Sequence, residues 1–230
     1  LWSWGSNWRG VLCDGTTMEK LTPTKVTTEQ KYTKVEASLF GSFLIDIDGY
    51  LWTCGSNVGG ILGVKSSYVK VPQKVSETVK FRDISVGDEH VIAIDSDGNL
   101  WSWGQNTYGE VGNGTSNEQR LPVKITQSTR FVAVSAGERH SLAIDEKGNI
   151  WAWGDNAYGK FGNGTMRDSF VPIQVTNNTK FTQTVSSKFF SMALDKDGNL
   201  FCWGQNGYGV FANGTSIYGE GLAPTMITLE

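Results

Sequence analysis

The chain has 230 residues and a formal net charge of −3, and 28 of its residues are glycine. A chain of this length can bury a sizeable core, and many glycines among short apolar runs favour an all-β domain. The acidic balance gives no general attraction to phosphates, so nucleic acid is not expected as a partner. There is no run of about 18 apolar residues and no signal-peptide pattern, so we expect neither a membrane span nor secretion.

The cysteine content predicts an intracellular protein. The chain has Cys13, Cys54 and Cys202, and any single disulfide would leave one of them unpaired. No C-x-x-C motif or histidine-rich metal spacing accompanies them. We therefore expect reduced thiols, a cytoplasmic or nuclear location, and no metal or other cofactor. The chain begins at Leu1 rather than Met, which suggests a fragment of a longer protein.

A tetrad of the form Trp-x-Trp-Gly returns, with substitutions, at nearly constant spacing. Its copies begin at Trp2, Trp52, Trp101, Trp151 and Phe201, so the steps are 50, 49, 50 and 50 residues. A repeat of this period built from short strands predicts a β-propeller, in which each unit buries its apolar faces against its neighbours.

The repeat divides the chain into units of unequal completeness. Residues 1–26 supply only the last two strands of a unit, whereas 32–75, 81–125, 131–175 and 181–229 each supply four. We predict one propeller domain over residues 1–230, with about five blades of four antiparallel strands and an incomplete first blade. Completion by residues before Leu1 and some other closure between the termini both remain open.

The unit at 131–175 gives the clearest strand prediction. Residues 131–135 are expected as the innermost strand, 140–145 as the second and 150–153 as the third. Residues 171–175 contain a proline, which cannot donate to a ladder on both sides, so this strand is expected at the outer edge. The Asp-rich turns before the third strands indicate hairpins rather than calcium loops, because an EF-hand needs further oxygen ligands.

The repeated tryptophans and histidines are expected to be structural. Tetrad tryptophans can fill the wedges between blades and donate their N–H to a carbonyl. His90 and His140 occupy one slot of adjacent units, and the sequence fixes no hydroxyl or thiol nucleophile beside either of them. We expect hydrogen bonds that stabilise the blades, and no catalytic residues.

The motif order within the unit resembles a known repeat. Gly137-x-x-His140-Ser141-Leu142-Ala143, followed by Gly148-Asn149-Ile150-Trp151-Ala152-Trp153-Gly154, is similar to the repeat of the regulator of chromosome condensation family. The resemblance recurs five times and implies a propeller of four-stranded blades. Family members include the exchange factor for the small GTPase Ran, regulatory domains of ubiquitin ligases, a plant ultraviolet photoreceptor and a β-lactamase inhibitor. The fold therefore implies a binding surface rather than one activity.

Guanine nucleotide exchange on a Ran-like or Rho-like GTPase is one function that the resemblance implies. The Ran exchange factor presses acidic residues and a histidine of its inner loops on the GTPase, and Gly87-Asp88-Glu89-His90 resembles such a loop. Asp88 and Glu138 are the candidate exchange residues on this analogy. The exchange factor, however, has seven blades and an inserted β-wedge, and this chain has five tetrads and no comparable insertion.

A protein-binding face is the alternative that we favour. The loop after the third strand and the loop between the first two strands should open on one face, because antiparallel strands alternate their ends. That face should gather Trp8, Arg9, Tyr108, Glu110, Arg139, Tyr158, Lys160, Lys188 and Tyr208. Tyr, Trp and Arg dominate interface hot spots, although the tyrosines could also merely brace their own loops.

The sequence therefore predicts a non-enzymatic interaction propeller. It would act as a regulatory or scaffolding module of a larger protein, and it would bind another protein or another domain of its parent chain. A light sensor is disfavoured, because no copy has the Trp-Arg-His order that a resemblance to the photoreceptor would require.

Overall fold

The computed structural model of the chain describes residues 1–125, 128–175, 178–212, 214 and 220–227, and only the backbone of Tyr208 and Glu220. These residues form five antiparallel sheets, which we call blades 1 to 5 in chain order. Blade 1 has two strands, β1 (Trp2–Gly5) and β2 (Lys20–Lys25). No helix in the described ranges is long and apolar enough to span a membrane.

Blades 2 to 5 each have four strands that pair in chain order. Blade 2 contains β3 (Tyr32–Ala37), β4 (Gly41–Asp46), β5 (Leu51–Ser56) and β6 (Tyr68–Lys74). Blade 3 contains β7 (Phe81–Val86), β8 (His90–Asp95), β9 (Leu100–Gly104) and β10 (Gln119–Lys124). Blade 4 contains β11 (Phe131–Ala136), β12 (His140–Asp145), β13 (Ile150–Gly154) and β14 (Ser169–Gln174). Blade 5 contains β15 (Phe181–Ser186), β16 (Phe190–Asp195), β17 (Leu200–Gln205) and β18 (Glu220–Met226).

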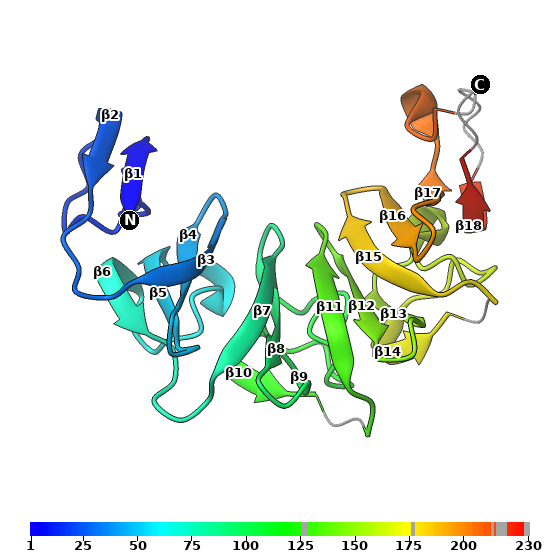
Figure 1. Cartoon of the computed structure of the whole chain (residues 1–230), viewed down its shortest axis with the longest axis horizontal. Coiled ribbons are helices and arrows are strands. Elements are labelled where there is room, and N and C mark those ends of the chain that lie inside the picture. Colours follow the sequence, from blue (N-terminus) through cyan, green and yellow to red (C-terminus); the bar gives the residue numbers. More distant parts are fainter. Residues whose placement is uncertain (126–127, 176–177, 213, 215–219, 228–230) are drawn as a thin grey trace.

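The blades lie side by side in an open arc (Figure 1). The first strands β3, β7, β11 and β15 line its concave side, and the later strands of each blade lie toward the outside. Blade 1 and blade 5 form the two ends of the arc. The predicted all-β propeller with an incomplete first blade is confirmed.

Burial follows the position of each strand within its blade. All six residues of β8 and all six of β12 are buried, because each strand is flanked on both sides in its own sheet and covered by the neighbouring blades. The outer strands carry all five prolines, Pro23, Pro72, Pro122, Pro172 and Pro224. An outer strand has only one hydrogen-bonded neighbour, so the missing N–H is tolerated there. The edge position predicted from proline is confirmed.

Aspartates close the hairpins between the second and third strands. The Asp145 Oδ1 accepts from the backbone N–H groups of Lys147 and Asn149, each at 2.9 Å, and its Oδ2 accepts from Trp151 Nε1 at 3.0 Å. Burial alone would raise the pKa of Asp145, but these hydrogen bonds outweigh it and lower the pKa. Asp46 and Asp95 make the same contacts in blades 2 and 3.

The second tryptophan of the tetrad fills the joint between consecutive blades. Trp103, Trp153 and Trp203 are fully buried. Their Nε1 atoms donate to backbone carbonyls of the preceding blade, to Ile61 at 2.8 Å and to Glu110 and Lys160 at 2.7 Å. The structural role expected for these tryptophans is confirmed. Trp4 has the same slot in blade 1, where it faces no preceding blade among the described residues, and it is 59% exposed.

The two histidines strengthen the joints on either side of blade 4. His90 Nε2 lies 2.9 Å from Ser141 Oγ, and that hydroxyl donates to the Glu110 carbonyl at 2.8 Å. The single hydroxyl proton goes to the carbonyl, so His90 must donate from Nε2 and its Nδ1 is left as an acceptor. His140 makes the equivalent contacts with Ser191 and the Lys160 carbonyl. Burial lowers the pKa of His90 to about 4 and lowers that of His140 well below its usual value, which keeps both rings neutral.

The expectation that all three cysteines are reduced is wrong for two of them. Cys13 and Cys54 form a disulfide between blades 1 and 2, with Cα atoms 5.5 Å apart, while Cys202 is free and buried. The reason lies in the repeat: Cys54 occupies the tryptophan slot, and Cys13 occupies the slot of Gly63, Gly112 and Gly162, which abuts that tryptophan at the other joints.

Candidate functional site

The loops after the third strands and the loops between the first two strands lie on the same side of the arc, which we call the loop face. The short loops are residues 38–40, 87–89, 137–139 and 187–189, and the long loops include 57–67, 105–118 and 155–168. Residues of both sets line a single cavity, so their predicted location on one face is confirmed.

A buried asparagine organises each long loop. The Asn106 Oδ1 accepts from the backbone N–H of Val111 at 2.9 Å, and its Nδ2 donates to the carbonyls of Thr115 and Asn117 at 2.9 and 3.0 Å. Asn156 does the same for the loop of blade 4. The asparagine therefore folds the loop back over itself and turns part of it into the core.

Glu110 and Lys160 are buried by this fold, whereas the sequence placed them on the exposed face. They are 3% and 2% exposed, because they lie directly before the residue whose N–H the asparagine holds. The Glu110 carboxylate accepts from the Tyr108 N–H at 2.8 Å, and burial raises its pKa. The Lys160 ammonium pairs with Asp155 at 2.7 Å. Neither side chain offers a broad surface to a partner.

Arg9 bridges blades 1 and 2 on the loop face. Its guanidinium carbon lies 4.0 Å from the centroid of Trp8 and 4.1 Å from the centroid of Phe40. Both ring faces attract a cation, so the stack ties a loop of blade 1 to a loop of blade 2. Trp8, which belongs to no tetrad, is 65% exposed.

Two similar contacts cross the joints on either side of blade 4. The Arg139 guanidinium lies 4.8 Å from the ring centroid of Tyr108 and donates to its hydroxyl at 3.2 Å. Tyr158, with a φ of 67°, packs edge-on against Phe189 with ring centroids 5.9 Å apart. These tyrosines therefore brace the joints while they stay partly accessible. The side chain of Tyr208 lies outside the described residues.

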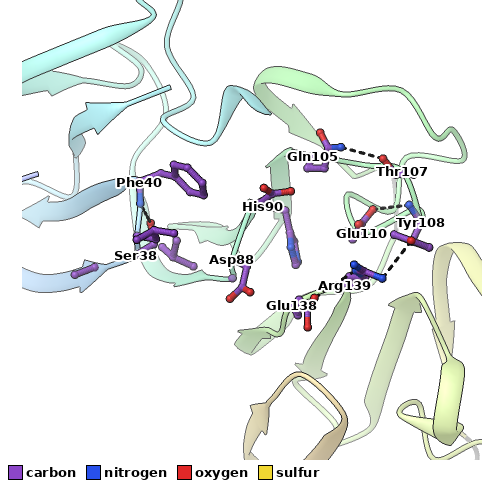
Figure 2. Close-up of a pocket in the computed structure, with 15 residues that line it drawn as sticks. Ser38, Phe40, Asp88, His90, Gln105, Thr107, Tyr108, Glu110, Glu138 and Arg139 are labelled. Carbon is purple, nitrogen blue, oxygen red and sulfur yellow. Dashed lines mark hydrogen bonds and ion pairs between the residues drawn. The ribbon is translucent and has the colours of Figure 1, made fainter. Parts of the chain in front are cut away.

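A cavity of about 620 Å³ opens on the loop face above blade 3. Figure 2 shows Phe40 on one side of it, Tyr108 and Arg139 on the other, and Asp88 and His90 between them. Glu89, Gln105 and Glu138 also line it. The cavity thus gathers the first-to-second-strand loops of blades 2, 3 and 4 around the long loop of blade 3.

The two candidate exchange residues differ in availability. Asp88 is exposed and makes no hydrogen bond or ion pair with its side chain among the described residues. Glu138 is only 16% exposed and is held by Arg139 Nε at 3.5 Å and by Lys188 Nζ at 3.1 Å. A partner could reach Asp88 directly, but it would have to compete with two cations for Glu138.

Phe40 and Phe189 belong to this surface, although the sequence prediction omitted them. Each directly precedes the second strand of its blade, at the slot that Arg139 fills in blade 4. Alignment of the repeats on that slot would have identified both. Among the described residues, no three His, Cys, Asp or Glu side chains converge closely enough to hold a metal ion.

Solved structures with the same fold extend beyond this chain. The chain superposes on human WBSCR16 with a TM-score of 0.85 at 20% identity, covering 100% of this chain and 66% of that one. Yeast RCC1 (Prp20) bound to Kap60 gives a TM-score of 0.83 at 20% identity, with 99% and 57% covered. Prp20p from Saccharomyces cerevisiae gives 0.84 at 22% identity, with 99% and 59% covered. The chain therefore spans less than two thirds of each of these proteins.

Matches at this level of identity show the fold alone. No curated protein sequence matches the chain. The family assignment comes instead from a match over nearly the whole sequence: residues 1–228 fit the model of the RCC1-like domain. The chain belongs to the RCC1-like domain family, as its repeat and its blades both indicate.

Proposed function

We propose that this chain is a non-enzymatic protein-interaction domain that binds through its loop face. Its partner would be another protein or another domain of its parent chain, and its role would be regulatory or scaffolding. One observation carries the proposal: Trp8, Tyr108, Arg139 and Tyr158 remain partly or largely exposed on the loop face, and Tyr108 and Arg139 line its cavity. Aromatic and arginine side chains of this kind supply most of the binding free energy in protein interfaces.

The related structures support this proposal by what they contain. One is the complex of yeast RCC1 with Kap60, and another concerns the binding of Prp20p to Gsp1p and histones. Both describe a propeller of this fold that binds other proteins. A partner for this chain is therefore sought among proteins rather than among small metabolites.

Matched surface variants test the proposal. A partner captured by the wild-type chain should be lost by the loop-face variant Tyr108→Ala/Arg139→Ala. It should be retained by Glu146→Ala/Lys147→Ala, which changes two exposed residues in the hairpin between β12 and β13, at the opposite end of the strands. Retention by the loop-face variant and loss by the hairpin variant would overturn the proposal. Thermal unfolding of each variant shows whether its fold is intact.

Guanine nucleotide exchange is the second candidate, and the exposure of Asp88 favours it. The measurement is release of labelled nucleotide from a panel of Ran, Rho and Rab GTPases. The interaction proposal predicts no acceleration of release by the wild-type chain. Acceleration that disappears in Asp88→Ala would replace that proposal with exchange, and a further loss in Glu138→Ala would extend the site.

We also propose an intracellular location, cytoplasmic or nuclear, as the three cysteines without a paired pattern favour. The Cys13–Cys54 disulfide weighs against it, because the glutathione and thioredoxin systems keep most cytosolic thiols reduced. Thiol labelling and mass spectrometry of the protein in its native cells would show whether Cys13 and Cys54 are reduced or disulfide-bonded there. Labelling of Cys13 and Cys54 supports the intracellular location, and protection of both until a reductant is added contradicts it.

A further inference from the structure

A side-chain contact covers most of the joints on the loop face. It joins one slot in the long loop of a blade to the residue directly before the second strand of the next blade. The pairs are Arg9 with Phe40, Tyr108 with Arg139, and Tyr158 with Phe189. Each pair is a cation on a ring or a ring on a ring, and we call such a pair a cap.

The joint between blades 2 and 3 lacks a cap. Its two slots are filled by Gly59 and Glu89. The three atoms nearest to a Cβ placed on Gly59 would all belong to Gln105, at 3.6–3.8 Å, so a side chain would make ordinary van der Waals contact there without a clash. Glu89 is exposed, and its side chain has no hydrogen bond or ion pair in the part of the chain that the structure describes. One carboxylate thus stands where the other joints hold a complete pair.

The cavity beside this joint has a surplus of acceptors. Glu89 and Gln105 line it together with Asp88, whose carboxylate has no partner among the described residues, whereas Glu110 and Glu138 also line it but are held by the Tyr108 N–H and by Arg139 and Lys188. Its single lining cation, Arg139, already contacts Glu138 and Tyr108.

His90 adds a further acceptor. It lines the cavity and is 1% exposed, and its Nδ1 has no partner in the described structure. Because Nε2 carries the proton that bonds Ser141, Nδ1 presents a lone pair. A donor from a ligand or from a water would satisfy this acceptor; the Nδ1 of His140, which does not line the cavity, is unpartnered in the same way.

We infer that this cavity binds the guanidinium group of an arginine side chain from a partner protein, beside Glu89, where the chain supplies no cap of its own. A guanidinium carries five N–H donors in a planar fork that matches a carboxylate, and it stacks on aromatic faces. The chain already uses that chemistry twice, in Arg9 on Phe40 and Arg139 on Tyr108. An ammonium group is a point charge without the planar face, and it would fit less well.

A peptide titration tests the inference without a known partner. The probe is acetyl-Gly-Arg-Gly-amide, observed by the backbone amide resonances of Gly59, Asp88, Glu89 and Gln105 in two-dimensional NMR spectra. We expect saturable shifts with the arginine peptide and none with the citrulline peptide, which keeps the shape but lacks the charge. Equal shifts with both peptides, or no shift with either, would overturn the inference.

Three variants sharpen the titration. Glu89→Gln should weaken arginine-peptide binding by about tenfold or more, because the carboxylate that pairs with the guanidinium is replaced by a neutral amide. Gly59→Tyr should block binding by placing a ring in the slot beside Glu89. The backbone accepts it, because Tyr158 has φ 67° and ψ 12° in the same slot and Gly59 has φ 60° and ψ 13°. Asp97→Asn, in an exposed hairpin, is the charge-matched control and should change nothing. Undiminished binding to both Glu89→Gln and Gly59→Tyr would contradict the inference.

The physiological reading rests on the proposed interaction function, yet the two can fail separately. A captured partner that leaves the Tyr108→Ala/Arg139→Ala variant but binds Gly59→Tyr as tightly as wild type would refute the arginine site and keep the interaction function. Specific binding of the arginine peptide by a chain whose partner ignores every loop-face variant would do the reverse.

Discussion

The joint between blades 1 and 2 and the joint between blades 3 and 4 use the same slots in different ways. Between blades 3 and 4, Trp153 fills the joint, packs against Gly112 and donates to the Glu110 carbonyl. Between blades 1 and 2, Cys54 and Cys13 replace that tryptophan and that glycine, and they are covalently linked. The Val11 carbonyl, equivalent to that of Glu110, accepts from Ser42 at 2.7 Å.

The difference shows that the two slots change together. A Cβ at Gly112 would lie 2.8 Å from the Trp153 indole, so the large ring requires a residue without a side chain opposite it. When the ring becomes a cysteine, space appears for a side chain on the other loop, and Cys13 uses it despite its φ of 60°. One joint is held by packing and hydrogen bonds, and the other by a covalent bond, so the two should respond to different perturbations.

Removal of the indole should have the largest effect. Trp153→Ala deletes a fully buried ring and removes one of the two donors to the Glu110 carbonyl, so we expect a loss of about 3–5 kcal/mol in the free energy of unfolding. Denaturant titration measures it. Trp4→Ala is the matched control in the same slot of blade 1, where the ring is exposed, and it should cost about 0.5 kcal/mol or less. Similar losses for both variants would show that the slot itself, rather than the joint, is stabilising.

Reduction of the disulfide should come next. Opening a loop that joins residues 41 apart typically costs about 2–4 kcal/mol. Thermal unfolding with and without a reductant measures the change, and hydrogen exchange should rise first in β1 and β2. The Cys13→Ser/Cys54→Ser variant should unfold like the reduced wild type and should not respond to reductant, because Cys202 is already a free thiol. A stability that is independent of reductant would mean that the remaining contacts hold blade 1.

Acid should destabilise the joint between blades 3 and 4, because it protonates His90. The folded pKa of His90 is about 4, below the usual value of 6.5, so the unfolded chain binds more protons between those values. The stability from the neutral ring is complete above pH 6.5 and is lost as the pH falls toward 4, with about 2 kcal/mol gone by pH 5. Unfolding free energies measured from pH 7 to pH 5 should fall less steeply in His90→Gln. An equal slope in both proteins would assign the acid sensitivity to other groups.

The caps on the loop face should matter least for stability. Tyr158→Ala removes an edge-to-face pair that is partly exposed, and we expect a loss of about 0.5–1.5 kcal/mol. Tyr158→Phe keeps the ring and should stay close to wild type in thermal unfolding. A loss for Tyr158→Ala as large as that of Trp153→Ala would place the caps among the main supports of the joints.

Much of this architecture could be predicted from the repeat. Strand order, the outer position of the proline-containing strands and the inter-blade role of the tryptophans all follow from periodicity and turn residues, because every blade solves the same packing problem. The burial of individual loop residues could not be predicted from the repeat. Glu110 and Lys160 occupy an apparently solvated loop, and only the hydrogen bonds of Asn106 and Asn156 turn them inward.

The disulfide was missed for a different reason. Counting cysteines treats each one alone, whereas Cys13 and Cys54 are informative as replacements for a glycine and a tryptophan that touch at other joints. Pairwise comparison of slots across the repeats would have identified them. The caps behave in the same way, since Phe40 and Phe189 gain meaning only beside the residue that faces them in the preceding blade.

The link between blades 1 and 2 also determines what a protease can release. The connection from β2 to β3 runs through residues 26–31 and ends at the exposed Lys31. A cut there separates residues 1–31 from the rest of the backbone, but Cys13 stays bonded to Cys54. On a non-reducing gel the nicked protein should migrate as one band, and it should divide into two only after reduction. Cleavage in this segment would therefore leave the arc assembled for as long as its surroundings stay oxidising.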